Sequence, residues 1–120
     1  MKELSNVIFE GLKSANIKNI GKRVYPIVAS KGAKFPFITY HIKILKPETK
    51  DRARDYYVDV VVYEEDYKET VEMMDEIIND VMPDISHNAK EYRFSLVSAD
   101  VKFSDKDNVF FGIITFKIVK

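Results

Sequence analysis

The sequence predicts an α+β fold with the element order α-β-β-β-α-β-β, in which two helices pack on one face of an antiparallel sheet. Two segments repeat apolar residues every three or four positions, which is typical of amphipathic helices. Several others alternate apolar and polar residues with a period of two, which is typical of strands. Short turns between successive strands favour antiparallel pairing. A chain of 120 residues has room for one core, so residues 1–120 are expected to form a single domain.

The first helix is predicted over residues 3–15, followed by a turn at Asn19-Ile20-Gly21. A short strand follows at Arg23-Val24-Tyr25 and is broken by Pro26. Residues 30–34 form a loop before the next strand begins at Phe35-Pro36. The helix stripe consists of Leu4, Val7, Ile8, Leu12 and Ala15, and the apolar residues of the second strand are Ile38, Tyr40, Ile42 and Ile44.

Residues 46–53 form a charged loop, and the third strand runs from Tyr56 to Tyr63. It is the segment with the strongest β propensity, because β-branched and aromatic residues fill both of its faces. One face consists of Val58, Val60 and Val62, and the other of Tyr57, Asp59, Val61 and Tyr63.

The second helix is predicted to begin after Asp66, with Glu69 three residues on, because this spacing caps the free N–H groups of a first turn. Pro83 is predicted to end it, and a loop then runs through His87. Its apolar stripe consists of Val71, Met74, Ile77, Ile78 and Val81.

Two further strands are predicted from about Tyr92 to Phe103 and from Val109 to Val119, joined by a turn at 104–108. The apolar residues of the earlier strand change parity between Leu96 and Val97, which indicates a β-bulge.

Composition narrows the classes of function. There are 19 basic and 19 acidic residues, so the basic surplus typical of nucleic-acid-binding domains is missing. A net charge of zero also weakens repulsion between copies, which suits a protein that associates with itself. Without cysteine the chain has no disulfides and no thiolate metal sites. No segment approaches the ~20 apolar residues of a membrane span, so we expect no membrane partner.

The residues that could carry chemistry do not form a recognisable site in the sequence. His41 and His87 are isolated, whereas zinc needs three or four ligands. Asp105 could begin a calcium loop, but phenylalanines occupy the glycine and glutamate positions of that motif. Glu64, Glu65 and Asp66 are better explained by helix capping than by acid–base catalysis. We therefore expect no enzyme activity, no metal and no cofactor, and we assign the aromatic residues mainly to the core.

One local cluster of basic residues is present in the charged loop and its surroundings. It could steer an anionic partner, although Glu48, Asp51 and Asp55 are interleaved with it. The cluster consists of Lys43, Lys46, Lys50, Arg52 and Arg54.

Three stretches in this order resemble the tail-completion, or tail-terminator, proteins of siphophages and prophages. They are Gly21-Lys22-Arg23-Val24-Tyr25-Pro26, Phe35-Pro36-Phe37-Ile38-Thr39-Tyr40 and Tyr57-Val58-Asp59-Val60-Val61-Val62-Tyr63. The resemblance covers residues 4–81 in order and spacing, and the last two strands in general character. Val61 stands where a polar residue is expected in relatives. A face covered by a neighbouring subunit would account for it, as would a looser match.

The resemblance implies a structural protein of virion assembly that caps the tail tube and joins it to the head. Such a subunit would form a homo-oligomeric ring, a hexamer in the family's pattern, at the head–tail junction of the virion after assembly in the bacterial cytoplasm. Its partners would be the tail-tube protein and the head-completion protein. DNA would pass through the lumen without sequence-specific binding.

Residues at the predicted strand edge and in the charged loop are the candidates for the interface between subunits. An unprotected strand edge offers unpaired N–H and C=O groups to another chain. Two other classes of function stay open: a small ligand-binding domain or enzyme with a site built from scattered polar residues, and a nucleic-acid-binding sheet. The interface candidates are Arg23, Tyr25, Lys46, Lys50, Arg52 and Arg54.

Overall fold

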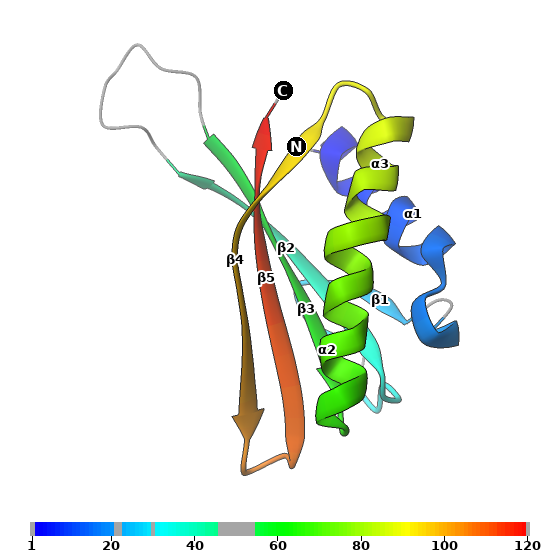
Figure 1. Ribbon diagram of the computed structural model, residues 1–120, viewed down its shortest axis with the longest axis vertical. Coiled ribbons are helices and arrows are strands. Elements are labelled where there is room, and N and C mark those ends of the chain that lie inside the picture. The colour runs from blue at the N-terminus through cyan, green and yellow to red at the C-terminus, as the bar shows by residue number, and fades with distance from the viewer. Residues whose placement is uncertain (1, 21–22, 30, 46–54, 120) are drawn as a thin grey trace.

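The computed structural model describes residues 2–20, 23–29, 31–45 and 55–119. Two layers, one of helices and one of strands, make up the fold (Figure 1). The helices are α1 (Lys2–Ala15), α2 (Tyr67–Glu76) and α3 (Met82–Asn88), with a short 3₁₀ turn at Ile17–Asn19 and a π-helical turn at Ile77–Val81. The strands are β1 (Val24–Pro26), β2 (Phe37–Leu45), β3 (Asp55–Glu64), β4 (Arg93–Ser104) and β5 (Val109–Val119).

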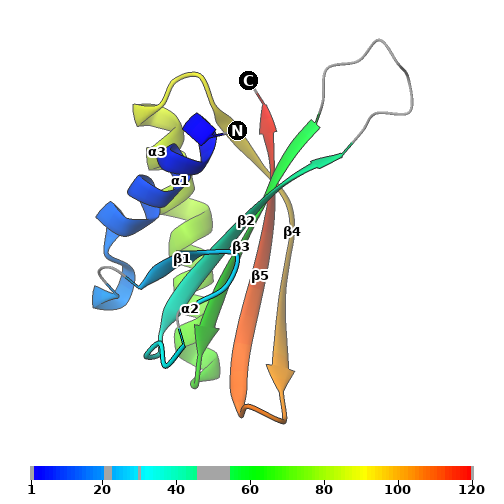
Figure 2. The same ribbon diagram turned by 180° about the vertical axis from the view of Figure 1, so that it is seen from behind.

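The strands form one sheet in the order β1-β2-β3-β5-β4, and the helices lie on one side of it (Figures 1 and 2). Tyr40, Val60 and Ile114 are neighbours across the three central strands, and all three are buried beneath the helices. The predicted α+β class, with helices on a single face, is therefore confirmed.

Several local predictions are confirmed in detail. The Asp66 carboxylate accepts a hydrogen bond of 3.2 Å from the backbone N–H of Glu69, which is the predicted cap. The pairing of β4 with β5 shifts between Leu96 and Ser98, where the change of parity indicated a bulge.

The expectation of a wholly antiparallel sheet is wrong for one pair of strands. β1 runs parallel to β2, with Val24 opposite Ile38 and Pro26 opposite Tyr40. The backbone N–H of Ile27 donates to the carbonyl oxygen of Tyr40, and that of Ile38 to Arg23. In a parallel pair the chain must return to the end at which the first strand began. Residues 27–36 separate the two strands, and so short a connection is sufficient because β1 is only three residues long.

The second helix extends beyond its predicted end. Pro83 lies in the first turn of α3, and the helical path continues to Asn88, so His87 belongs to a helix rather than a loop. Proline lacks an N–H and crowds the carbonyl group four residues earlier. The wider π-helical turn directly before it alters the hydrogen bonding at that point, so the chain passes Pro83 without breaking the helix.

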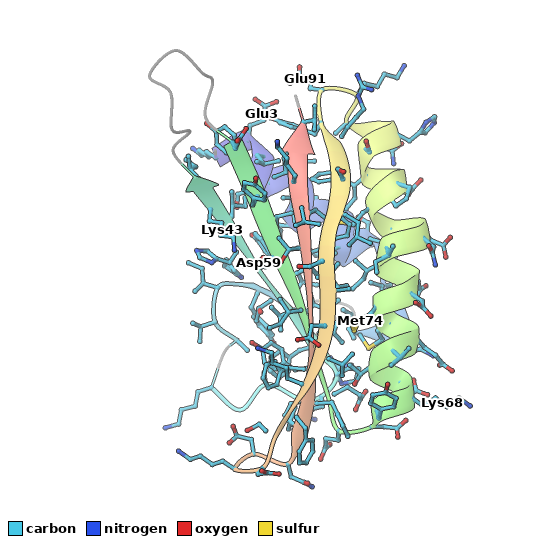
Figure 3. All side chains as sticks on the ribbon, turned by 60° about the vertical axis from the view of Figure 1, so that its left-hand side comes forward. Glu3, Lys43, Asp59, Lys68, Met74 and Glu91 are labelled. Atoms are coloured by element: carbon cyan, nitrogen blue, oxygen red, sulfur yellow. The ribbon has the colours of Figure 1, made fainter. Side chains whose placement is uncertain are left out.

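Two glycines allow the helices to approach their neighbours closely. A Cβ atom added to Gly11 of α1 would clash with Cγ1 of Ile85 in α3, and one added to Gly112 of β5 would clash with Sδ of Met74. Figure 3 shows Met74 at the side of α2 that faces the sheet. These close contacts fix α1 against α3 and α2 against β5, with Ile8, Val60 and Ile77 fully buried between the layers.

The two outer strands differ in exposure. β1 is short, contains Pro26 and packs beside α1. β4 is 12 residues long, and most of its side chains are exposed although they point to both faces of the sheet. The helix layer therefore does not extend over most of β4, as Figure 1 also shows.

Candidate functional site

The face of the sheet opposite the helices, here called the open face, carries a line of aromatic side chains. Three neighbouring pairs are stacked: Phe35 on Phe37 at 5.3 Å between ring centroids, Phe37 on Tyr63 at 4.6 Å, and Tyr63 on Phe111 at 6.4 Å. Tyr25 meets Phe37 edge to face at 6.1 Å. We call Tyr25, Phe35, Phe37, Tyr63 and Phe111 the aromatic row. It crosses the sheet from β1 to β5 because β2, β3 and β5 place these residues at matching register positions.

A shallow groove of about 580 Å³ lies along this row, and every residue of the row except Tyr25 lines it. Its walls are mainly aromatic and aliphatic, with polar groups only where the turn between β4 and β5 borders it. Large exposed apolar surfaces on soluble proteins commonly mark binding sites for other molecules. The lining residues are Phe35, Phe37, Tyr63, Ser104, Asp107, Val109 and Phe111.

The other end of the open face is polar. One carboxylate oxygen of Asp59 accepts a hydrogen bond of 2.7 Å from the Thr115 hydroxyl, and the other lies 3.1 Å from the Lys43 ammonium group. Figure 3 shows Lys43 and Asp59 side by side on neighbouring strands. His41 is exposed opposite Asp59 in the pairing of β2 with β3. Both oxygens of Asp59 are thus engaged within the sheet, which gives this cluster a structural role.

The predicted interface residues have different outcomes. The Arg23 side chain donates from Nε to the carbonyl oxygen of Ile20 at 3.2 Å, so it holds the chain just before β1. Tyr25 lies at the start of the aromatic row, on an outer strand of the sheet. Lys46, Lys50, Arg52 and Arg54 lie outside the described residues, and the prediction that they form an interface stays a prediction.

The zero net charge conceals an uneven distribution along the chain. Residues 11–47 contain eight lysines and arginines and no acidic residue, whereas residues 64–84 contain nine acidic residues and one lysine. The acidic stretch forms α2 and the start of α3. Lys18, from the basic stretch, joins the two, with its ammonium group 2.8 Å from Glu72 and 3.2 Å from Glu69.

These contacts shift the pKa values of Lys18 and Glu72. The hydrogen bonds that the Lys18 ammonium group donates to Glu72, and then to Glu69, raise its pKa above the ordinary value. The same hydrogen bond from Lys18 lowers the pKa of the Glu72 carboxyl group. The side chains of Lys18, Glu69 and Glu72 are all exposed. Their two ion pairs therefore orient the turn after α1 against α2 without adding much stability.

Within the ranges that the structure describes, no group of three or more His, Asp or Glu side chains is placed to hold a metal ion. None of the helices described there is long and apolar enough to cross a membrane.

The sequence interpretation assigned the aromatic residues mainly to the core, and within the aromatic row this holds for Phe37, which is buried, but not for the other four residues. Tyr63 and Phe111 are half-buried on the open face, while the core beneath the helices is mostly aliphatic. A signal was present, since apolar residues occupy both parities of β3 and β5, as Val61 and Ile113 also show. Such a pattern predicts a strand with apolar residues on both faces. Only the register between strands, however, brings the rings into one row.

Comparison with models of protein families and with curated proteins finds no match for this chain.

Proposed function

We propose that this chain is a ring-forming structural subunit that caps the tail tube of a phage or prophage and joins it to the head. In this proposal the open face and the outer strands bind neighbouring protein subunits, and DNA passes through the ring without being read. The protein acts by assembly rather than by catalysis.

The observation that carries the proposal is the position of the residues that resemble the tail-completion family. Described residues of the three stretches contribute to the consecutive strands β1, β2 and β3, which are neighbours in the sheet. Four aromatic residues from them, Tyr25, Phe35, Phe37 and Tyr63, contact one another in the aromatic row. If these aromatic residues served only to stabilise the fold, we would expect them on the face of the sheet that the helices cover. Aromatic residues on an uncovered face are instead typical of protein interfaces.

Deletion of the gene from its phage or prophage tests this function. We expect induced cells to accumulate filled heads and separate tail tubes, visible by negative-stain electron microscopy, and a plasmid copy to restore joined particles. The matched variant Val119→Thr should restore joining as well as wild type, because Val119 lies at the end of β5, away from the aromatic row. Normal joined virions from the deletion strain would contradict the proposal, as would a genome without portal or tail genes nearby.

The groove beside the aromatic row supports a second candidate, a domain that binds a small apolar ligand. Apolar walls with a few polar groups at one side are common in ligand sites. Saturable binding of an apolar fluorescent dye, lost in Phe111→Ser and retained in Val119→Thr, would favour this candidate if the deletion strain also assembles normal virions.

A further inference from the structure

We infer that two copies of this chain pair through the outer edge of β4, in an antiparallel register centred on Val101 that joins their sheets into one. In the part of the chain that the structure describes, β4 pairs only with β5 and forms one edge of the sheet. A two-fold contact of this kind closes with two copies. It does not build a ring, so the inference goes beyond the proposed function and does not depend on it.

The edge of β4 is long enough to pair with another chain. The strand runs over 12 residues and contains neither proline nor glycine. Its bulge lies between Leu96 and Ser98, which leaves 98–104 as the regular segment of the strand. A regular edge presents unpaired N–H and C=O groups to another chain. β1, at the opposite edge of the sheet, is a poor alternative because it is three residues long and includes Pro26.

The charges of the regular segment fit an antiparallel copy of the same segment. Asp100 and Lys102 are its charged residues, so its net charge is zero, and both are exposed. Both lie on the open face, because Lys102 is opposite Phe111 in the pairing with β5. When Val101 lies opposite its counterpart, Asp100 of each copy lies opposite Lys102 of the other. Opposite charges in directly opposite positions stabilise a strand pair, and this register forms two such pairs.

Neighbouring registers lose these ion pairs. A shift by two residues places Asp100 opposite Asp100 or Lys102 opposite Lys102, and like charges in opposite positions are destabilising. A shift by one residue places the apolar face of one segment against the charged face of the other. The register centred on Val101 also aligns the whole regular segment, with Ser98 opposite Ser104.

The other face of the segment fits the same register. Ala99, Val101 and Phe103 lie on the side of the sheet that carries the helices, because Ala99 is opposite the buried Ile114 of β5. In the pairing, Phe103 lies opposite Ala99 of the other copy, so a large side chain meets a small one. Phe103 is 44% exposed in the single copy and would lose much of this exposure. The helix layer does not extend over most of β4, which leaves room for the second copy (Figure 1).

A second copy is the occupant that these observations favour. A two-fold contact requires a surface that is complementary to itself. The charges, the side-chain sizes and the ends of the regular segment are all arranged symmetrically about Val101, whereas a strand from a different protein would not require this symmetry. The paired edge is small, and small interfaces are weak, so the pair should form as the protein concentration rises.

Single cysteines test the register, because the natural chain contains none. Val101→Cys places two thiols directly opposite each other, within the roughly 4–7 Å between Cα atoms that a disulfide spans. We expect this variant to form a disulfide-linked dimer on mild oxidation, visible on a non-reducing gel. Ala99→Cys is the matched control, because its counterpart lies four residues out of register. It should stay unlinked alone and should link to Phe103→Cys when the two are mixed.

Charge exchange in the Val101→Cys background tests the ion pairs. Asp100→Lys places lysines opposite one another, and Lys102→Asp does the same with carboxylates. Each should reduce the linked fraction to the level of Ala99→Cys. The double exchange Asp100→Lys/Lys102→Asp should restore linking, as should an equimolar mixture of the two single exchanges. Circular dichroism spectra unchanged from wild type would show that each variant is folded.

Three results would overturn the inference: a Val101→Cys variant that stays unlinked, an Ala99→Cys variant that links to itself equally well, or linking that the single charge exchanges leave unchanged. The deletion strain gives an independent readout. Linking at Val101→Cys together with intact virions would keep the β4 contact and remove the tail role. Defective joining without linking would keep the tail role and remove the contact.

Discussion

Lys18 links the basic and the acidic parts of the chain, and its contribution should depend on pH. The Glu72 carboxyl pKa is lowered in the folded protein, so the stabilisation from the pair is present above the ordinary glutamate pKa and is lost as the pH falls through the lowered value. The Lys18 pKa is raised, so the same stabilisation is lost as the pH rises through that raised value. It is therefore largest around neutral pH.

Lys18→Gln should return the Glu72 carboxyl pKa upward toward its ordinary value, measured by NMR titration of the side-chain carbon. Lys68→Gln is the matched control, because Lys68 acts on Glu72 only through a weaker Coulombic attraction and should produce a smaller rise. An unchanged Glu72 titration in Lys18→Gln would show that the ion pair is absent in solution.

The two close glycine contacts should respond differently to an added methyl group. Gly11→Ala meets Ile85, whose branched side chain is buried and has little freedom, so we expect a loss of about 1–3 kcal/mol in the free energy of unfolding. Gly112→Ala meets the flexible Met74, which can move aside at smaller cost.

Urea denaturation measures both effects. The double variant Gly11→Ala/Ile85→Val removes one methyl group from the neighbour and should recover part of the loss. If Gly112→Ala proves more damaging than Gly11→Ala, the helix layer packs less closely at α1 and α3 than this structure indicates.

At the scale of elements, the two sides of β3 should tolerate different substitutions. Val60 is fully buried, so Val60→Asp should reduce the free energy of unfolding by about 3–5 kcal/mol through an unpaired charge in the core. Ile78 packs against the core but is only partly buried, so Ile78→Asp should cost less. Val61→Thr, on the open face, should change stability by less than about 1 kcal/mol. Thermal unfolding followed by circular dichroism ranks the three, and a Val61→Thr loss comparable to that of Val60→Asp would contradict the assignment of faces.

The structural features that the sequence predicts correctly are those that depend only on residues close together in the chain. The Asp66 cap, the bulge after Leu96 and the alternation of Val58, Val60 and Val62 each depend on neighbouring residues, and each is confirmed. The parallel pairing of β1 depends on where the chain returns after Pro26, and the passage of the helix beyond Pro83 depends on a π-helical turn. Neither has a pattern in the nearby sequence that identifies it.

The candidate site was less predictable than the fold for the same reason. Phe37, Tyr63 and Phe111 are separated by tens of residues, and only the pairing of β2, β3 and β5 makes them neighbours. The partial exposure of Tyr63 and Phe111 depends on which face the helices cover. A period of two identifies the two faces of a strand but does not say which is covered when both carry apolar residues.

At the scale of the whole molecule, helices cover one face of the sheet and not the other (Figures 1 and 2). The aromatic row lies on that other face, where Tyr63 and Phe111 are half-buried. A small patch gives a weak pairwise contact, because affinity depends on a well-packed central cluster. Closing a ring multiplies such contacts, since each subunit then binds two neighbours. We therefore expect a monomer in dilute solution and rings at high concentration or on a tail tube.

Electron microscopy of tail tubes tests the central claim most directly. Tubes assembled from the major tail protein of the same phage would be mixed with the purified chain and imaged, with class averages computed for the tube ends. We predict a ring of this protein on one end of each tube, with six-fold symmetry in end-on views. Tubes with unchanged ends at saturating protein concentration would contradict the account, as would binding along the tube walls.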